Sequence, residues 1–427
     1  MKKRMAVWLL VLAMLTTMGG VVFAAENEEL KGKLIVAGAG GAEGEMGEQV
    51  DRFHEAFPNV EVEFANFTSE KYTELFAAMK SSGEQIDIMY LNAQDLRRYA
   101  VAGDLVDLSD LSYKDRFRPV GIETFTIDGK LWAVPRGSIG GFNVYYNKAL
   151  LEEYGFSYPE TYDELVTIGQ ALAADGISTV THPGKNIYLW PVWFFSTYEQ
   201  ATGGKSMEYT IDTLKGTRKF TDPEVVLGLD LIGQFTKDGL FIKGINSTDG
   251  DGSLANIITR RALMAITLDW RAVKLATEGT GEVELDVALL PYLTADKVQP
   301  IYPGGPGMAF SIYSGINPDN RAMADAFIEF VTRDDQIAQA AAKWDWNTTI
   351  NANVPSPSDE PMIQKFDREI AEYMVTYLDW YWPPEITRAF QEGIQAVADG
   401  QKDGTQVAEE IQAVFDKLVA EGYEFVD

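Results

Sequence analysis

The chain has 427 residues, of which 46% are hydrophobic and 12% aromatic, a composition typical of a folded globular protein rather than a disordered one. Its length predicts about two or three domains. The absence of cysteine excludes disulfides, thiolate metal sites and a cysteine nucleophile, and the formal net charge of −28 opposes binding to nucleic acid or to an anionic lipid surface.

Residues 1–24 have the pattern of a secretory signal peptide. Three positive residues open the chain, an apolar run follows at Met5–Leu15, and small residues precede the bond after Ala24, where we expect cleavage. The alternative is a membrane anchor, but the apolar run is short for a spanning helix. Cleavage would remove three positive charges and leave a net charge of −31. Because no cysteine is available for lipid attachment, we expect the mature protein to diffuse freely in a periplasm.

The next segment alternates strands with helices, which predicts a parallel sheet covered by helices. One predicted helix carries apolar residues at helical spacing, and they are Met46, Val50, Phe53 and Phe57. Ser69 is expected to open the second helix and Gly83 to close it. The predicted strands cover 32–41, 59–67 and 85–92, and the helices cover 43–58 and 69–83.

Beyond residue 127 the pattern changes. Asp128-Gly129 is typical of a hairpin turn, and a glycine-rich stretch at 137–141 interrupts a long strand. Thr161 and Glu164 have the spacing of a capping box at a helix start. Further helices with interspersed strands are expected to the end of the chain, where the last helical region is broken at "YWPPE".

These segments, in this order, resemble the maltose-binding-protein-like group of periplasmic solute-binding proteins, the extracellular sugar-binding proteins of bacterial ABC importers. The most telling stretch is "IDGKLWAVPRGSIGGFNVYYNKALLEEYGFSYPETYDEL". Each segment is degenerate alone, whereas the ordered set is specific and covers nearly the whole mature chain. The other segments that carry the resemblance are 33–64, 85–108, 260–272, 303–312, 321–333 and 383–401.

The resemblance implies an α/β fold of two lobes, with three crossings of the chain between them and a ligand trapped in the cleft by hinge closure. The crossings are expected near Ile139–Phe142, Gly305–Met308 and Lys343–Ile350. The lobes are then expected to comprise 25–140 with 308–345, and 141–307 with 346–427. The implied partners are a carbohydrate and an inner-membrane ABC permease, and the number of tryptophans favours a carbohydrate of more than one ring. The protein is expected to be a monomer that uses no cofactor or metal.

Aromatic and charged residues after an apolar strand are the first candidates for ligand contact. Asp269, Trp270 and Arg271 follow the strand "ALMAITL", and ligands of open α/β sheets lie beyond the carboxyl ends of strands. An indole can cover the apolar C–H face of a sugar, while polar groups bind its hydroxyls. The resemblance places further tryptophans near the cleft, with core packing as the alternative for each: Trp190, Trp193, Trp344 and Trp346.

Four polar residues complete the predicted site. Glu43 follows the first glycine loop and is a candidate for ligand contact. The alternative is a solvated acid at the start of a helix, where acids are favoured. Asn92 ends the third strand, at a position where relatives bind hydroxyls. Arg136 and Arg388 are candidate donors to hydroxyl groups, with surface exposure as the alternative.

Two other functions remain open from the sequence. A secreted glycoside hydrolase would need paired carboxylates, which the 64 acidic residues do not exclude. The same fold could also bind a non-sugar solute such as an amine or an anion, although the abundance of tryptophan favours carbohydrate. No motif of a hydrolase or a metalloprotease is present, so we expect a binding protein and no enzyme.

Overall fold

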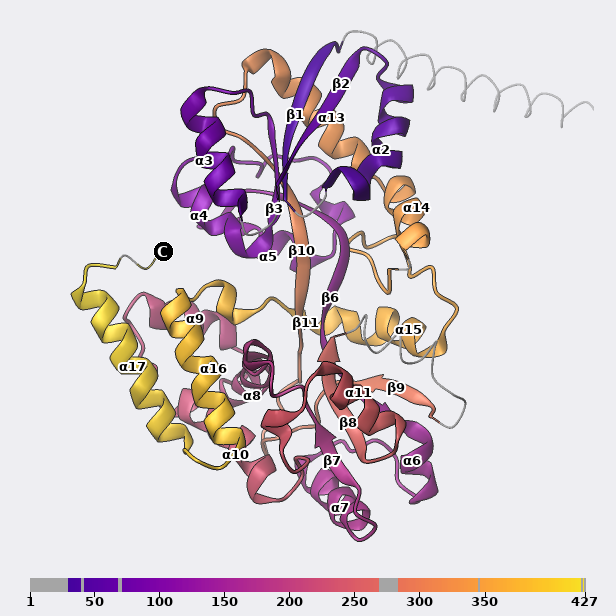
Figure 1. The fold of residues 1–427 in the computed structure, drawn as a ribbon, viewed down its shortest axis with the longest axis vertical. Helices are drawn as coiled ribbons and strands as arrows, with labels where there is room; N and C mark the ends of the chain where they lie inside the picture. Colours follow the sequence, from indigo (N-terminus) through magenta and orange to yellow (C-terminus); the bar gives the residue numbers. More distant parts are fainter. Residues whose placement is uncertain are drawn as a thin grey trace, which may run out of the picture. The chain divides into compact units, whose positions relative to one another are not determined.

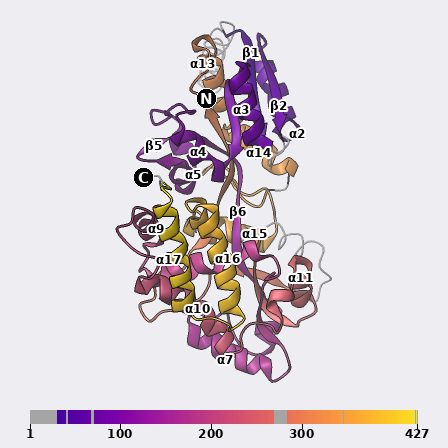
Figure 2. The ribbon, with the colours of Figure 1, turned by 60° about the vertical axis from the view of Figure 1, so that its left-hand side comes forward.

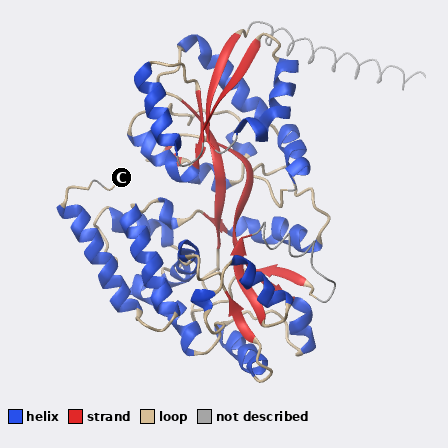
Figure 3. Ribbon diagram, in the orientation of Figure 1, coloured by secondary structure: helices blue, strands red, loops and turns tan. Residues whose placement is uncertain are grey.

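The computed structural model describes residues 30–39, 42–67, 71–268, 283–344, 346–423 and 425. The chain divides into two compact units. Unit 1 contains the chain up to Gly137, Gly307–Ala340 and Ile350–Val354, and unit 2 contains the remainder. Helices surround the strands in both units, as Figure 3 shows. The predicted signal peptide lies outside the described residues.

The sheet of unit 1 has the strand order β2-β1-β3-β10. Its first three strands are parallel, and β10 runs antiparallel to β3 with Met308 opposite Asn92. Because parallel strands end at the same edge, the residues that follow β1, β2 and β3 lie along one side of the sheet. The strands of unit 1 are β1 (Gly32–Ala39), β2 (Val60–Phe67), β3 (Ile88–Asn92), β4 (Thr126–Ile127) and β5 (Lys130–Leu131), with parts of β6 (Val134–Asn147) and β10 (Tyr302–Ile312).

Helices cover both faces of this sheet (Figure 1). They are α2 (Ala42–Ala56), α3 (Tyr72–Ser82), α4 (Leu96–Val101), α5 (Pro119–Thr124), α13 (Arg321–Val331) and α14 (Asp334–Trp344), the last of which reaches into unit 2. The predicted apolar face of α2 is confirmed, because all four of its residues are buried. Phe53 packs edge-on against Phe327 and Phe330 of α13, with ring centroids 5.1 and 5.5 Å apart. Gly83 ends α3 with a left-handed φ of 72°, as predicted, whereas Ser69 lies outside the described residues.

The predicted hairpin at Asp128-Gly129 is confirmed. It joins β4 to β5, which pair antiparallel. Both turn residues have positive φ, 53° for Asp128 and 73° for Gly129, as a two-residue turn of this kind requires.

In unit 2, β6 lies between β8 and β9 and pairs antiparallel with each, and β7 runs parallel to β8. At the start of β10, Tyr302 and Pro303 pair with β11. This sheet holds the rows of apolar side chains on which the helices of the unit pack. Its remaining strands are β7 (Ser178–Thr181), β8 (Ala262–Leu268), β9 (Leu285–Ala288) and β11 (Met374–Val375).

The helices of unit 2 are α6 (Lys148–Glu153), α7 (Tyr162–Ala173), α8 (Pro191–Ala201), α9 (Ser206–Leu214), α10 (Pro223–Lys237), α11 (Gly250–Ile258), α15 (Pro361–Lys365), α16 (Pro384–Ala398) and α17 (Gly404–Ala420). Figure 2 shows α16 and α17 side by side, and α10 packs against both of them. The predicted capping box is confirmed, since the Thr161 hydroxyl accepts from the Glu164 N–H and the Glu164 carboxylate from the Thr161 N–H.

The chain passes between the two units in β6, in β10 and in the segment that follows α14. In β6 the division falls between Gly137 and Ser138, and in β10 between Pro306 and Gly307. The third passage is more complex than predicted, because 341–349 belong to unit 2, 350–354 to unit 1 and the chain from Pro355 on to unit 2. The reason is Ile350, which is fully buried and whose N–H donates to Gly137 O.

Glycine allows β6 and β10 to come close together within unit 2. A Cβ on Gly141 would lie 2.2 Å from Pro303 O and 2.7 Å from Gly304 Cα. A Cβ on Gly304 would lie 2.8 Å from Gly140 O. No side chain fits at either position without moving a backbone, so glycine at 141 and 304 is required by packing between the two strands.

The variant Gly141→Ala should destabilise the protein by about 1–3 kcal/mol, because its methyl group collides with backbone atoms that cannot rotate away. Gly140→Ala is the matched control, since a Cβ there has no atom within 4 Å and neither glycine has a positive φ. Urea unfolding of both variants measures the difference. Equal stability of the two variants would contradict the close approach of β6 and β10.

Candidate ligand-binding site

The polar edge of unit 1 brings two predicted site residues to one side of the sheet. Glu43 begins α2 just after β1, and Asn92 ends β3. Glu43 is exposed, and its carboxylate accepts a hydrogen bond of 2.7 Å from the Asn66 amide at the end of β2. The Asn92 side chain is half-buried and hydrogen bonds to Asp95, whose pKa burial raises. Asn66 was not predicted, because only strand pairing places it beside Glu43.

Arg136 has a different role from the one predicted. Its side chain is buried in unit 1 and donates to Tyr90 Oη at 3.0 Å and to Gln49 Oε1 at 3.1 Å. Gln49 in turn donates to Val331 O at 3.0 Å. The guanidinium therefore ties β6 to β3 and α2 just before the chain leaves unit 1. This corrects the expectation that Arg136 presents donors to a ligand.

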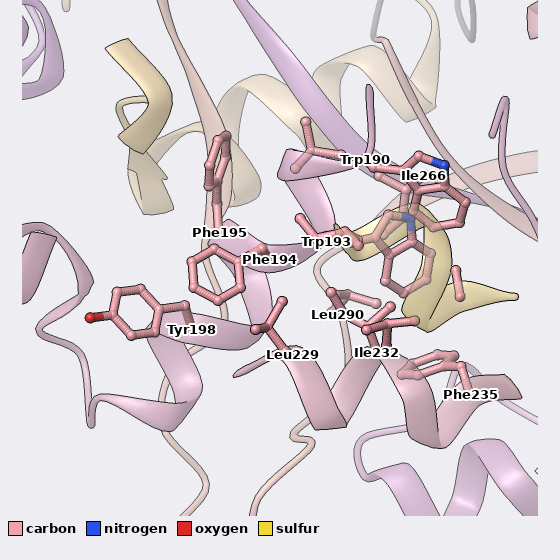
Figure 4. Packing of buried hydrophobic residues seen from close by; sticks show 14 of the residues in the cluster. Trp190, Trp193, Phe194, Phe195, Tyr198, Leu229, Ile232, Phe235, Ile266 and Leu290 are labelled. Atoms are coloured by element: carbon pink, nitrogen blue, oxygen red, sulfur yellow. The ribbon is translucent and has the colours of Figure 1, made fainter. Parts of the chain in front are cut away.

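The prediction that Trp190 and Trp193 contact the ligand also requires correction. Both indoles have 0% exposed surface and lie in the hydrophobic core of unit 2, and Figure 4 shows them among Ile232, Phe235 and Ile266. The Trp190 indole N–H donates to Gly184 O at 3.1 Å. Trp193 packs edge-on against Phe235 at 5.2 Å between centroids. Neither indole has a face left for a sugar ring, so both have a packing role at the start of the buried helix α8.

His182 completes this aromatic core. Its ring centroid lies 4.5 Å from that of Trp190 and 6.1 Å from that of Trp193. Burial lowers the pKa of His182 to about 3, so the ring is neutral near neutral pH, and its Nδ1 lies 3.3 Å from Ile266 O. Because an imidazolium cannot form there without large cost, His182 serves packing rather than acid–base chemistry.

The remaining predicted residues are accessible or lie outside the described ranges. Trp344 is 46% exposed at the end of α14, with the Lys343 ammonium 5.0 Å from its ring centroid, and Trp346 is half-buried. Arg388 is exposed on α16 and pairs with Glu392 one turn later. Asp269, Trp270 and Arg271 lie outside the described residues, so the part of the site that begins after β8 stays a prediction.

A short segment before α16 carries a candidate that the sequence did not reveal. Asp379 lies in a single helical turn, η9 (Leu378–Trp380), beside half-buried aromatic rings of Tyr377, Trp380 and Tyr381. Burial raises the pKa of Asp379 to about 7, and its own backbone N–H, which hydrogen bonds to the carboxylate, offsets part of that rise. A carboxylate with a raised pKa beside indole and phenol rings is a candidate for contact with a polar ligand.

Within the described ranges, no three His, Asp or Glu side chains are close enough together to hold a metal ion. Over the same residues, no helix has the length and apolar composition that crossing a bilayer demands.

The burial of Trp193 predicts a clear contrast between two tryptophan variants. Trp193→Ala should lower the free energy of unfolding by about 3–5 kcal/mol, because it leaves a cavity in a packed core. Trp344→Ala should change it by less than about 0.5 kcal/mol, since that indole is largely exposed. Thermal and urea unfolding distinguish the two variants. If Trp193→Ala were as stable as the wild type, the burial of this indole would be contradicted.

The pKa of Asp379 makes stability depend on pH. The carboxyl group binds its proton more tightly in the folded chain than in the unfolded chain, where its pKa is about 4. Its contribution to stability is therefore complete below pH 4 and is lost as pH rises through about 7. Asp379→Asn should match the wild type at pH 4.5 and melt higher than it by roughly 2–4 °C at pH 8. A melting-temperature difference that stays constant with pH would contradict the burial of this group.

Comparison with known proteins identifies the kind of molecule. The family model described as "Bacterial extracellular solute-binding protein" matches residues 48–366. An uncharacterized ABC transporter extracellular-binding protein of Pyrococcus horikoshii is 22% identical over 181 residues, and that alignment spans 42% of each chain.

Two solved structures have the same fold. A family 1 extracellular solute-binding protein from Bifidobacterium longum subsp. infantis has a TM-score of 0.78 at 18% identity, over 91% of this chain and all of the other. RafE from Streptococcus pneumoniae has a TM-score of 0.73 at 19% identity, over 91% of this chain and 99% of the other. The predicted two-lobed α/β fold is thereby confirmed, and the chain belongs to the family of bacterial extracellular solute-binding proteins.

Proposed function

We propose that this protein captures a carbohydrate outside the cytoplasm and delivers it to an ABC permease in the membrane. The observation that carries the proposal is the likeness of fold, over nine tenths of the chain, to proteins that include RafE, of which one structure is a complex with raffinose. The same family is one of binding proteins, and we infer that the chain binds its ligand without chemical change.

The chemistry of the accessible residues supports a sugar as the ligand. A pyranose has apolar C–H faces and a rim of hydroxyl groups, so it binds between aromatic rings and polar side chains. Unit 1 offers Glu43, Asn66 and Asn92 along one edge of its sheet. Trp344, Trp346 and Arg388 supply exposed or half-buried candidates, and Asp269, Trp270 and Arg271 are proposed to add a stacking indole.

The mechanism follows from the division of the chain. Two units that are joined by β6, by β10 and by the segment around Ile350 can rotate about those connections. A ligand that contacts both units binds the closed arrangement more tightly than the open one, and this difference in affinity drives closure. The closed, liganded protein would be the form that the permease recognises.

The predicted signal peptide and the absence of cysteine support a cleaved protein that diffuses freely. We propose that it acts as a monomer in the periplasm.

A calorimetric screen of the purified mature protein tests this function. The panel contains raffinose, maltose, galactose and chitobiose, with putrescine and phosphate as the two non-sugar controls. We expect saturable binding of at least one saccharide with 1:1 stoichiometry, together with a change in tryptophan fluorescence. Binding of putrescine or phosphate in place of every sugar would overturn the ligand assignment. Release of shorter sugars during overnight incubation would favour a glycoside hydrolase.

A further inference from the structure

The third connection of the chain enters unit 1 only at 350–354 and is firmly docked there. Ile350 has no exposed surface, and its N–H donates to Gly137 O at 3.0 Å. The Asn351 side chain is also fully buried, and its amide donates to Thr332 O at 2.8 Å. These bonds fix the start of the segment beside the point at which β6 leaves unit 1.

The two ends of this segment are held together in unit 2 by one buried carboxylate. Asp367 accepts a hydrogen bond from the Thr348 hydroxyl and another, of 3.2 Å, from the Ser356 N–H. Thr348 precedes the segment and Ser356 follows it, and all three residues are buried. We name Thr348, Ser356 and Asp367 the Asp367 clasp. Breaking it would leave buried polar groups without partners, so the two ends stay together in the folded chain.

The clasp has a rigid base. Its acid lies in a single π-helical turn, η7 (Phe366–Ile370), and turns of this kind are frequent at functional sites. The Phe366 ring meets the Tyr302 ring of β10 edge-on, with centroids 5.1 Å apart and planes at 90°. One residue before the turn, the Lys365 ammonium pairs with Asp286 of β9 at 2.7 Å. The carboxylate is therefore tied to two strands of unit 2.

The clasp reduces the links to the docked segment to a single residue on each side. On the N-terminal side this residue is Thr349, which also pairs with Ser138 in unit 2. On the C-terminal side Pro355 alone lies between the clasp and the buried Val354, so the length of this link depends on the clasp. A single residue spans at most about 3.6 Å, and the φ angle of a proline is fixed. With the clasp open, the C-terminal link would extend as far as α15.

We propose that Asp367 is a positioning residue that keeps the third connection short and thereby limits how far the two units can rotate apart. A short connection permits fewer open arrangements than a long one, so less conformational entropy is lost when the units close. Closure around a ligand is therefore more favourable with the clasp intact. This role goes beyond the proposed function, because it concerns the motion of the unliganded protein and does not depend on which ligand is bound.

The absence of cysteine allows a direct measurement of this range of motion. Spin labels are attached through Ala78→Cys on α3 of unit 1 and Gln170→Cys on α7 of unit 2, both at exposed positions, and pulsed electron paramagnetic resonance gives the distribution of distances between them. Asp367→Ala should widen this distribution by about 1.5- to 2-fold, toward longer distances, because the C-terminal link becomes longer. Glu369→Ala is the matched control, since it removes an exposed acid from the same turn and should leave the distribution unchanged.

A second variant decides the question if Asp367→Ala does not fold. Two glycines inserted after the exposed Pro355 lengthen the same link and leave the bonds of the clasp in place, so this variant should fold and show the same widening. If the folded variants keep the distance distribution of the wild type, the clasp serves stability alone and the proposal is wrong.

Sugar binding gives a second readout. Any sugar of the panel that the wild type binds should bind the widened variants about 3- to 10-fold more weakly, because more of the free protein is open. Equal affinity would contradict the effect of the clasp on closure. If the wild type binds no sugar of the panel, the proposed function is overturned, and the distance distributions still decide the role of Asp367.

Discussion

The close approach of β6 and β10 is the constraint on which the arrangement of the site depends. Both strands supply residues to both units, and within unit 2 they meet through Gly141 and Gly304 with no room for a side chain. Ligand contacts therefore cannot come from side chains at that point of the first crossing. Packing of two backbones thus decides which parts of the chain are available for recognition.

The tryptophans divide between packing and surface in a way that their number alone does not indicate. Trp190 and Trp193 fill the core of unit 2 together with a neutral His182, and Trp382 stacks on Phe390 of α16. A core made of large rings is stiff, because each ring has few rotamers and many contacts. Trp344 is exposed at the end of α14, and Trp380 is half-buried against Tyr377. The buried indoles therefore serve packing, and exposure rather than residue type separates them from the accessible ones.

Local features of the fold could be predicted from the sequence, and long-range roles could not. The apolar face of α2, the turn at Asp128-Gly129 and the capping box at Thr161 each depend on residues within one or two turns of each other. Arg136 finds its acceptors 46 and 87 residues away, and no local pattern distinguishes that arrangement from an exposed guanidinium. The prediction that Trp190 and Trp193 contact a ligand was wrong for a similar reason, since an indole can pack in a core as well as on a sugar ring. The brief return of Ile350 to unit 1 depends on its burial there, which only the folded chain reveals.

The raised pKa of Asp379 could not be predicted from the sequence either, because it depends on the surroundings of the side chain and not on the residue type. An aspartate between aromatic residues resembles any helix-start acid, and only desolvation gives it a pKa of about 7. A leucine or an asparagine at this position would avoid the cost of ionising a buried carboxylate. The protein is therefore less stable at neutral pH than it would be with an uncharged side chain at position 379. Desolvation in the folded chain, rather than composition or periodicity, decides the pKa of this residue.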